Sequence, residues 1–135
     1  MAVQLSVAAR NAALDAFETA TGVSAVVKIR TGAAPATCAT ADSGTVVATM
    51  SLAADWMSAA AAGAKAMTGT WSDAAADNTG TAAHFRIYAT DGTTCHAQGT
   101  VTATGGGGDM TLNSTAVVAG QSVTVNSFTL TAGNA

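Results

Sequence analysis

Charged residues are scarce in this sequence. Aspartate, glutamate, lysine and arginine make up 10% of the 135 residues, whereas an average soluble domain has roughly 25%. The five basic residues are spread along the chain and the net charge is −3. No basic patch is therefore available to hold phosphates, and we expect no nucleic-acid partner. Such a composition favours a protein that sits in an assembly over a soluble domain that is merely rich in alanine and threonine.

Aromatic residues are also few, at 4% of the chain, although hydrophobic residues as a class make up 49%. Much of that hydrophobic half is alanine, so the large aromatic side chains reduce to a short set: Phe17, Trp56, Trp71, Phe85, Tyr88 and Phe128. A chain of this length forms one domain with a modest core, and at ~25 cal/mol per Å² such a core stabilises it only modestly. We therefore expect neighbouring subunits to contribute stability, as in a homodimer or homotrimer.

Long apolar runs and an N-terminal targeting signal are missing. No stretch approaches the ~18 consecutive apolar residues of a membrane-spanning helix. The N-terminus lacks the basic region and compact apolar region of a signal peptide. We expect no membrane partner and synthesis in a cytoplasm.

Cysteine occurs only twice, at Cys38 and Cys95, and three interpretations are open. The favoured one is two free, partly buried thiols. A disulfide between them would form only after exposure to an oxidising environment. A metal site that also uses His84 and His96 is the weakest interpretation, because the spacing matches no zinc pattern. We therefore predict no metal and no cofactor.

The stretch with the clearest pattern is Gly80–Val101, which predicts a β-hairpin around Asp91-Gly92. A two-residue turn would mix apolar and polar side chains on each face, whereas a three-residue loop ending in Gly92 separates them. One face then carries Ala83, Phe85, Ile87, Cys95, Ala97 and Val101. The other face carries His84, Arg86, Tyr88, Thr94, His96 and Gln98. We predict that this second face is surface, or a contact patch centred on Arg86 and Tyr88.

Residues 3–21 predict one N-terminal helix that ends at Gly22. Ser6 is a potential N-cap for a later start. The narrow apolar stripe consists of Val3, Val7, Leu14 and Phe17. Such a stripe packs on a sheet edge of the same chain, the commoner outcome, or on a partner subunit.

The remaining chain predicts strands separated by turns. Strands are expected over 24–30, 45–52, 64–71, 109–112, 117–119 and 122–131, with a bulge near Asn126-Ser127. The glycine run 105–108 is interpreted as a connection, because neither a helix nor a lysine follows it as a phosphate cradle would need. The pattern predicts a mainly β, single-domain antiparallel β-sandwich or jelly roll over 23–135, preceded by the helix over 1–22.

No catalytic constellation is visible in the sequence. Five carboxylates fall in or near turns, where aspartate commonly bonds its own backbone: Asp55, Asp73, Asp77, Asp91 and Asp109. Asp73 and Asp77 lack the closely spaced oxygen ligands of a calcium loop. His84 and His96 have no activated nucleophile placed beside them. We predict that the chain is not an enzyme and has no catalytic residues.

Several short motifs, weak singly but distinctive as a set, resemble a known group of proteins. They are Leu5–Ala12, Asp55–Met57, Gly69–Trp71, Ala83–Tyr88, Thr94–His96, Gly105–Met110 and Ser127–Leu130. In order and spacing they resemble a family of small, mostly uncharacterised structural proteins of tailed bacteriophages and prophages. The resemblance spans nearly the whole chain and carries over no active-site residue.

The resemblance implies a virion protein assembled in the cytoplasm of a bacterial host. Small β-sandwich proteins of this kind commonly act as capsid decoration (cement) proteins, so the first expectation is contact with the major capsid protein. A collar, tail or fibre-associated subunit that binds tail or collar proteins is the alternative. A receptor- or glycan-binding module for the host is a third function, for which only Trp56, Trp71 and Tyr88 offer suitable side chains. We expect the contacts to use Val3, Val7, Leu14 and Phe17 together with Arg86 and Tyr88.

Overall fold

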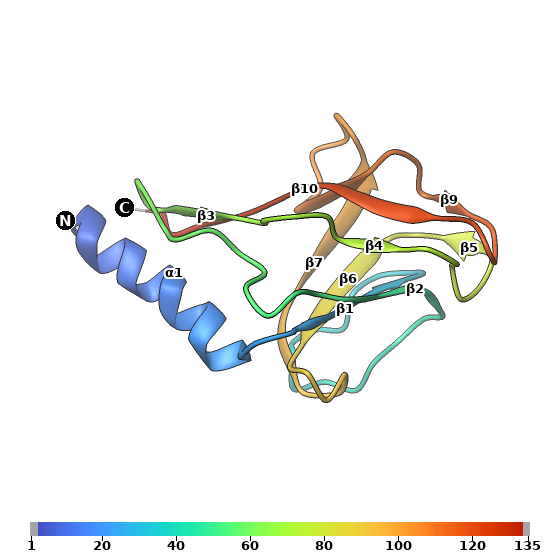
Figure 1. Ribbon diagram of the computed structural model, residues 1–135, viewed down its shortest axis with the longest axis horizontal. Helices are drawn as coiled ribbons and strands as arrows, with labels where there is room; N and C mark the ends of the chain where they lie inside the picture. Colours follow the sequence, from blue (N-terminus) through green and yellow to red (C-terminus); the bar gives the residue numbers. More distant parts are fainter. Residues whose placement is uncertain (1–2, 134–135) are drawn as a thin grey trace.

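The structure is a computed structural model that describes residues 3–133. Within this range one helix, α1 (Val7–Thr21), precedes ten strands (Figure 1). The first five strands are β1 (Val26–Arg30), β2 (Val46–Ser51), β3 (Ala64–Ala66), β4 (Ser72–Asp73) and β5 (Gly80–Thr81). The last five are β6 (His84–Tyr88), β7 (Cys95–Ala103), β8 (Met110–Leu112), β9 (Ala116–Val117) and β10 (Val123–Thr131). The prediction of a mainly β, sandwich-like fold with one N-terminal helix is confirmed.

Most strands belong to one curled sheet with the order β2-β1-β6-β7-β8-β10-β3, and β4 also pairs with β10. The pairing of β7 with β8 is parallel, so the sheet is mixed. The sheet folds over so that β10 and β4 face β1 and β2 (Figure 1). The backbone N–H of Thr49 in β2 donates to the carboxylate of Asp73 in β4, at 2.9 Å, and ties the two layers together.

Five of the six aromatic residues form one continuous series of ring contacts. Ring centroids of successive partners lie 5.3 to 5.9 Å apart along the series Phe17, Trp56, Trp71, Phe128 and Phe85. Distances and tilted or edge-on geometries of this kind are favourable for aromatic pairs. The series connects α1 to the central hairpin, so the few large side chains hold the distant parts of the fold together.

The central hairpin keeps Phe85 and Ile87 on one face with Ala97 and Val101 as predicted, but its register is shifted by two residues. A three-residue loop ending in Gly92 would set Phe85 opposite Ala97 and Ile87 opposite Cys95. Instead, Phe85 lies opposite Gly99 and Ile87 lies opposite Ala97. The loop is longer than predicted, because the Asp91 carboxylate accepts the backbone N–H groups of residues 93 and 94. A register shift then places Cys95 opposite Tyr88, so the prediction that Cys95 shares the apolar face is wrong.

Helix α1 begins later than the predicted residue 3. The Ser6 hydroxyl accepts the backbone N–H of Ala9 at 3.1 Å, which makes Ser6 the N-cap. Gly22 ends the helix as predicted: with φ +89° its N–H donates to the carbonyl of Glu18. None of the helices in the described part of the chain is long and apolar enough to cross a membrane.

The predicted strand over 64–71 is interrupted. Only β3 is regular there, because Gly69 adopts φ +66° and Thr68 donates its N–H to the carbonyl of Trp56. The alanine-rich run 58–62 is not helical, since Ala61 and Ala64 exchange backbone hydrogen bonds in a tight turn. The predicted bulge in β10 is confirmed by a register shift between Val125 and Ser127.

Gly44 lies at the end of the loop that joins β1 to β2, at a position where the backbone conformation requires glycine. Its φ is +73°, and an added Cβ would lie 2.0 Å from the carbonyl oxygen of Thr31. We expect Gly44→Ala to lower the free energy of unfolding by about 2–3 kcal/mol, since both the torsion and the contact are unfavourable. Gly120→Ala is the control, because φ is +86° there but no atom lies within 4 Å of the added Cβ. Equal losses in urea denaturation of the two variants would contradict this account.

Candidate functional site

Basic side chains line the sheet face opposite the core. The antiparallel register of β1 and β6 sets Lys28 opposite Arg86 and Arg30 opposite His84. Like charges directly across two strands repel each other. This arrangement is therefore stable only if another part of the chain brings a negative charge to the same face.

That charge is Asp42, which is carried by residues 31–45 (the covering segment). The Asp42 carboxylate accepts hydrogen bonds from Arg30 Nη2 at 2.9 Å and from the Tyr88 hydroxyl at 2.7 Å, and it forms an ion pair with Arg86. Bonds of this kind, in which the acceptor is ionised, are the stronger class of hydrogen bond. Asp42 was not among the residues that the sequence singled out.

Arg86 has further partners that bind the covering segment to the hairpin. Its Nη2 donates to the carbonyls of Thr37 and Thr40, at 2.8 and 3.0 Å, and its Nε donates to Gln98 Oε1. Lys28 Nζ lies 5.2 Å from the centre of the Tyr88 ring, within the range of a cation–π contact. The polar face of the hairpin therefore binds the covering segment and stabilises its folded position.

The expectation that this face lies at the surface is wrong. His84, Arg86 and Tyr88 are 1%, 2% and 0% exposed. The covering segment excludes water from these three side chains. The sequence could not show this, because polar side chains alternate along a strand in the same way whether their face contacts solvent or a loop. Arg86 and Tyr88 are therefore not available on the surface as the predicted contact patch.

The ionisation of the cluster follows its contacts. Desolvation opposes ionisation of Asp42, but hydrogen bonds from Tyr88 and Arg86 and the charges of Arg30 and Arg86 outweigh it and hold the pKa of Asp42 below its ordinary value. Burial and the hydrogen bond to Asp42 raise the pKa of Tyr88. At neutral pH Asp42 is therefore a carboxylate and Tyr88 is a neutral phenol.

The depressed pKa of Asp42 predicts a loss of stability in acid. A carboxyl whose pKa is lower when folded stabilises the protein above the ordinary pKa of about 4, and this contribution disappears as the pH falls through the folded value. We expect the difference in unfolding free energy between the parent protein and Asp42→Asn to be large at pH 6 and smaller at pH 3. Urea denaturation at both pH values measures it. A difference that does not change with pH would contradict the assignment.

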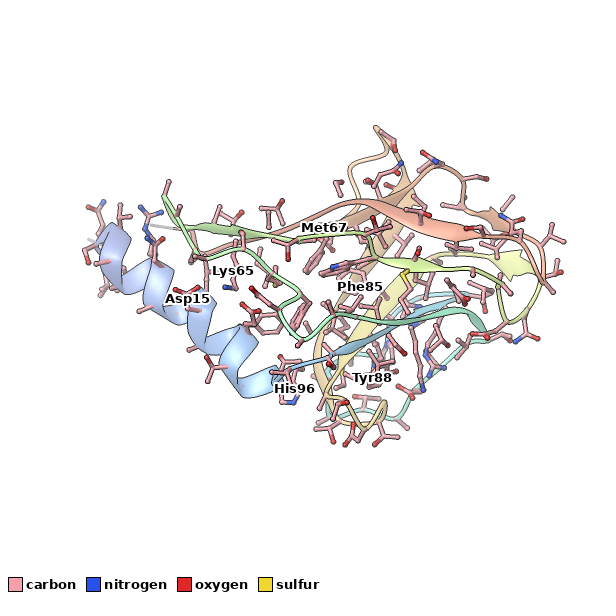
Figure 2. All side chains as sticks on the ribbon, viewed as in Figure 1. Asp15, Lys65, Met67, Phe85, Tyr88 and His96 are labelled. Carbon is pink, nitrogen blue, oxygen red and sulfur yellow. The ribbon has the colours of Figure 1, made fainter. Side chains whose placement is uncertain are left out.

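A second polar cluster fixes α1 to β3. The ammonium of Lys65 is buried and lies 2.7 Å from each of Asp15 Oδ1, Glu18 Oε2 and the carbonyl of Ser58. Burial disfavours the charged ammonium, but the hydrogen bonds and charges of Asp15 and Glu18 outweigh it and raise the pKa of Lys65. Figure 2 shows Asp15 and Lys65 directed toward each other between the helix and the strand.

Beside this cluster an open groove of about 660 Å³ separates α1 from residues 54–68 (the α1 groove). Its lining consists of Asp15, Glu18, Thr19, Gly22, Val23, Ala54, Asp55, Met57, Ser58, Ala59, Lys65 and Thr68. Three of these side chains are acidic and one is basic, so the groove has a net negative charge. It therefore favours a ligand surface that presents a cation.

The predicted apolar stripe of α1 divides into two parts. Leu14 is buried, and Phe17 packs edge-on against Trp56 with ring centroids 5.8 Å apart. Val3 and Val7 are 81% and 47% exposed. The stripe thus packs within the chain at one end and lies open to solvent at the other.

Four of the five exposed large apolar side chains in the described residues lie next to this helix in the sequence or within it. The five are Val3, Leu5, Val7, Val23 and Val118, and Val118 follows β9 instead. The first three precede or begin α1, and Val23 follows it and lines the α1 groove. Isolated exposed apolar residues are ordinary, whereas a cluster marks a contact surface. We call Val3, Leu5 and Val7 the N-terminal apolar cluster.

The structure brings the two cysteines together. Cys38 Sγ and Cys95 Sγ lie 2.7 Å apart, and both residues are half-buried free thiols. His84 Nδ1 hydrogen-bonds instead to the carbonyl of Gly32 at 2.7 Å. Across residues 3–133 no three His, Cys, Asp or Glu side chains are grouped as metal ligands.

Comparison of the chain with protein-family models, curated proteins and solved structures finds no match in any of the three.

Proposed function

We propose that this chain is a non-enzymatic structural protein of a tailed-phage virion, and first of all a capsid decoration protein that binds the major capsid protein. The sequence resemblance supplies the viral setting. The observation that carries the mode of action is the N-terminal apolar cluster. It lies at the end of the molecule where α1, β3 and the C-terminal part of β10 extend away from the other strands (Figure 1). Contact through this end leaves the two-layered body exposed.

The composition of the neighbouring surface defines the expected partner. An apolar contact at residues 3–7 combined with the acidic α1 groove fits a shell subunit that presents apolar side chains beside a basic one. The cluster alone is small, so several contacts per particle, or an oligomer of this chain, would strengthen attachment. A dimer or trimer is part of this proposal.

The cluster can be tested without disturbing the fold. Removing α1 would also remove Leu14 and Phe17 from the core and leave Lys65 without its carboxylates, so a deletion confuses binding with folding. Substitutions at exposed positions avoid this problem, because their effects on stability are usually within about 0.5 kcal/mol.

We expect Val3→Asp combined with Val7→Asp to reduce binding about tenfold or more to particles assembled without this chain. A charge placed in the centre of a desolvated contact costs at least ~1.4 kcal/mol, which is tenfold in affinity. The matched control is Val118→Asp: Val118 is 57% exposed and directly follows β9, at the opposite end from α1 (Figure 1). Co-sedimentation measures the bound fraction. Undiminished binding of the double variant, or an equal loss in the control, would contradict the proposal.

A collar, tail or fibre-associated subunit is the second candidate, because the same surface serves any neighbouring virion protein. The glycan-binding alternative loses its support. Trp56, Trp71 and Tyr88, the side chains it requires at the surface, are 1%, 1% and 0% exposed.

A further inference from the structure

The thiol pair lies where the covering segment meets the hairpin. Cys38 comes from the covering segment, whereas Cys95 is the first residue of β7 and lies opposite Tyr88. The two sulfurs are 2.7 Å apart, so less than 1 Å of movement separates them from the ~2.05 Å of a disulfide bond.

The surrounding contacts hold the two thiols together before any bond forms. Arg86 binds the carbonyls of Thr37 and Thr40, on either side of Cys38, and Gln98 Nε2 donates to the carbonyl of Pro35. The segment is therefore already fixed on the hairpin by charge and hydrogen bonds. Closing a bond between groups that are already in contact requires little further ordering.

We propose that Cys38 and Cys95 are an oxidation-dependent clasp that is open as two thiols in a reducing cytoplasm and closes covalently when the protein meets a disulfide oxidant. The closed clasp fastens the covering segment to the hairpin across 57 positions of sequence. It strengthens the attachment that Asp42 and Arg86 provide through charge. The clasp is independent of the proposed virion role.

The reaction is thiol–disulfide exchange with a small-molecule disulfide such as oxidised glutathione. A deprotonated cysteine attacks one glutathione sulfur, breaks the glutathione S–S bond and releases one glutathione thiolate. The second cysteine then loses its proton, attacks the protein sulfur of the mixed disulfide and releases the second glutathione. Two protein thiols are oxidised to one disulfide, and one glutathione disulfide is reduced to two thiols.

Either cysteine can make the first attack, because the two sulfurs are in contact and both residues are half-buried. Once one sulfur carries glutathione, the other lies beside the bond that it must attack. Burial raises the pKa of the Cys95 thiol, and the charge of Arg86 opposes this and favours its thiolate. The pair therefore resolves within one chain and does not collect two glutathione adducts.

The test is to incubate the purified, pre-reduced full chain with oxidised glutathione at neutral pH and measure its intact mass under denaturing conditions. We expect the mass to fall by two hydrogen atoms, both thiols to become unreactive to a thiol reagent, and the melting temperature to rise by about 10 °C. Peptide mapping should recover Cys38 linked to Cys95. Cys38→Ser should show none of these three changes.

Two free thiols after oxidation, two glutathione adducts per chain, or disulfides between chains would each overturn the proposal. A second variant tests whether the Asp42 contacts position Cys38 before the disulfide forms. Asp42→Asn weakens the charge interaction that holds the covering segment, so the rate of disulfide formation should fall by about tenfold. Closure of this variant at the parental rate would refute the role of the Asp42 contacts in positioning Cys38. The intact mass shows whether the disulfide has formed, and this result does not depend on how stable the variants are.

Discussion

Replacing Asp42 with alanine is expected to lower the free energy of unfolding by about 2–4 kcal/mol. The substitution leaves Arg30 and Arg86 buried, at 7% and 2% exposure, without the carboxylate that neutralises them, and it removes the acceptor of the Tyr88 hydroxyl. Removing the carboxylate alone leaves two buried guanidinium charges uncompensated, although solvent reduces the cost because the Asp42 side chain is itself 38% exposed. Urea denaturation at neutral pH measures the loss.

Two further variants show whether the charge pair is responsible. Asp55→Ala removes an exposed carboxylate that has no ion pair within the described residues, and we expect a change of less than about 0.5 kcal/mol. Arg86→Met in the Asp42→Ala background should recover part of the lost stability, since the charge left without a partner is removed as well. Strict additivity of the Asp42 and Arg86 substitutions would show that the two side chains are not coupled.

Replacing Trp71 with alanine should have an effect of similar size, about 3–5 kcal/mol. Trp71 is 1% exposed, and its ring lies between Trp56 and Phe128, with centroid distances of 5.9 and 5.5 Å. Its loss would interrupt the aromatic series that joins α1 to the hairpin and leave a cavity that the flanking rings cannot fill. Thermal and urea unfolding with a common m-value would measure the change.

Trp71→Phe is the matched control for this prediction. The indole N–H of Trp71 is buried and has no hydrogen-bond partner in the described structure. Phenylalanine keeps much of the ring and removes this unsatisfied donor, so we expect it to cost less than about 1.5 kcal/mol. Trp56 differs, because its Nε1 donates to the carbonyl of Gly22 at 3.0 Å. If Trp71→Phe lowered the free energy of unfolding as much as Trp71→Ala, packing between the aromatic rings would not be the source of the stability.

Local chemistry accounts for the parts of the fold that could be predicted. Ser6 and Gly22 fix the ends of α1 by their own hydrogen-bonding and torsional properties, and the alternation around Asp91-Gly92 fixes the face that Phe85 and Ile87 share. These signals lie within a few residues of the features that they determine. The interruption at Gly69 was missed because the alternation of Met67, Gly69 and Trp71 continues through it.

The candidate site depends on contacts between distant segments, which alternation does not encode. Asp42 meets Arg86 across 44 positions of sequence, and Lys65 meets Asp15 across 50. A polar strand face has the same pattern under water and under a loop, so Arg86 and Tyr88 were expected at the surface. Likewise, the stripe on α1 defines a face but does not say that Leu14 packs inward while Val3 remains exposed.

The copy number of this chain relative to the major capsid protein in purified particles, measured by quantitative mass spectrometry, tests the proposed function most directly. A decoration protein covers the shell, so the account predicts a ratio comparable to that of the capsid protein. A small fraction would contradict decoration and place the chain at a vertex, collar or tail. Absence from the particles would contradict the virion role altogether.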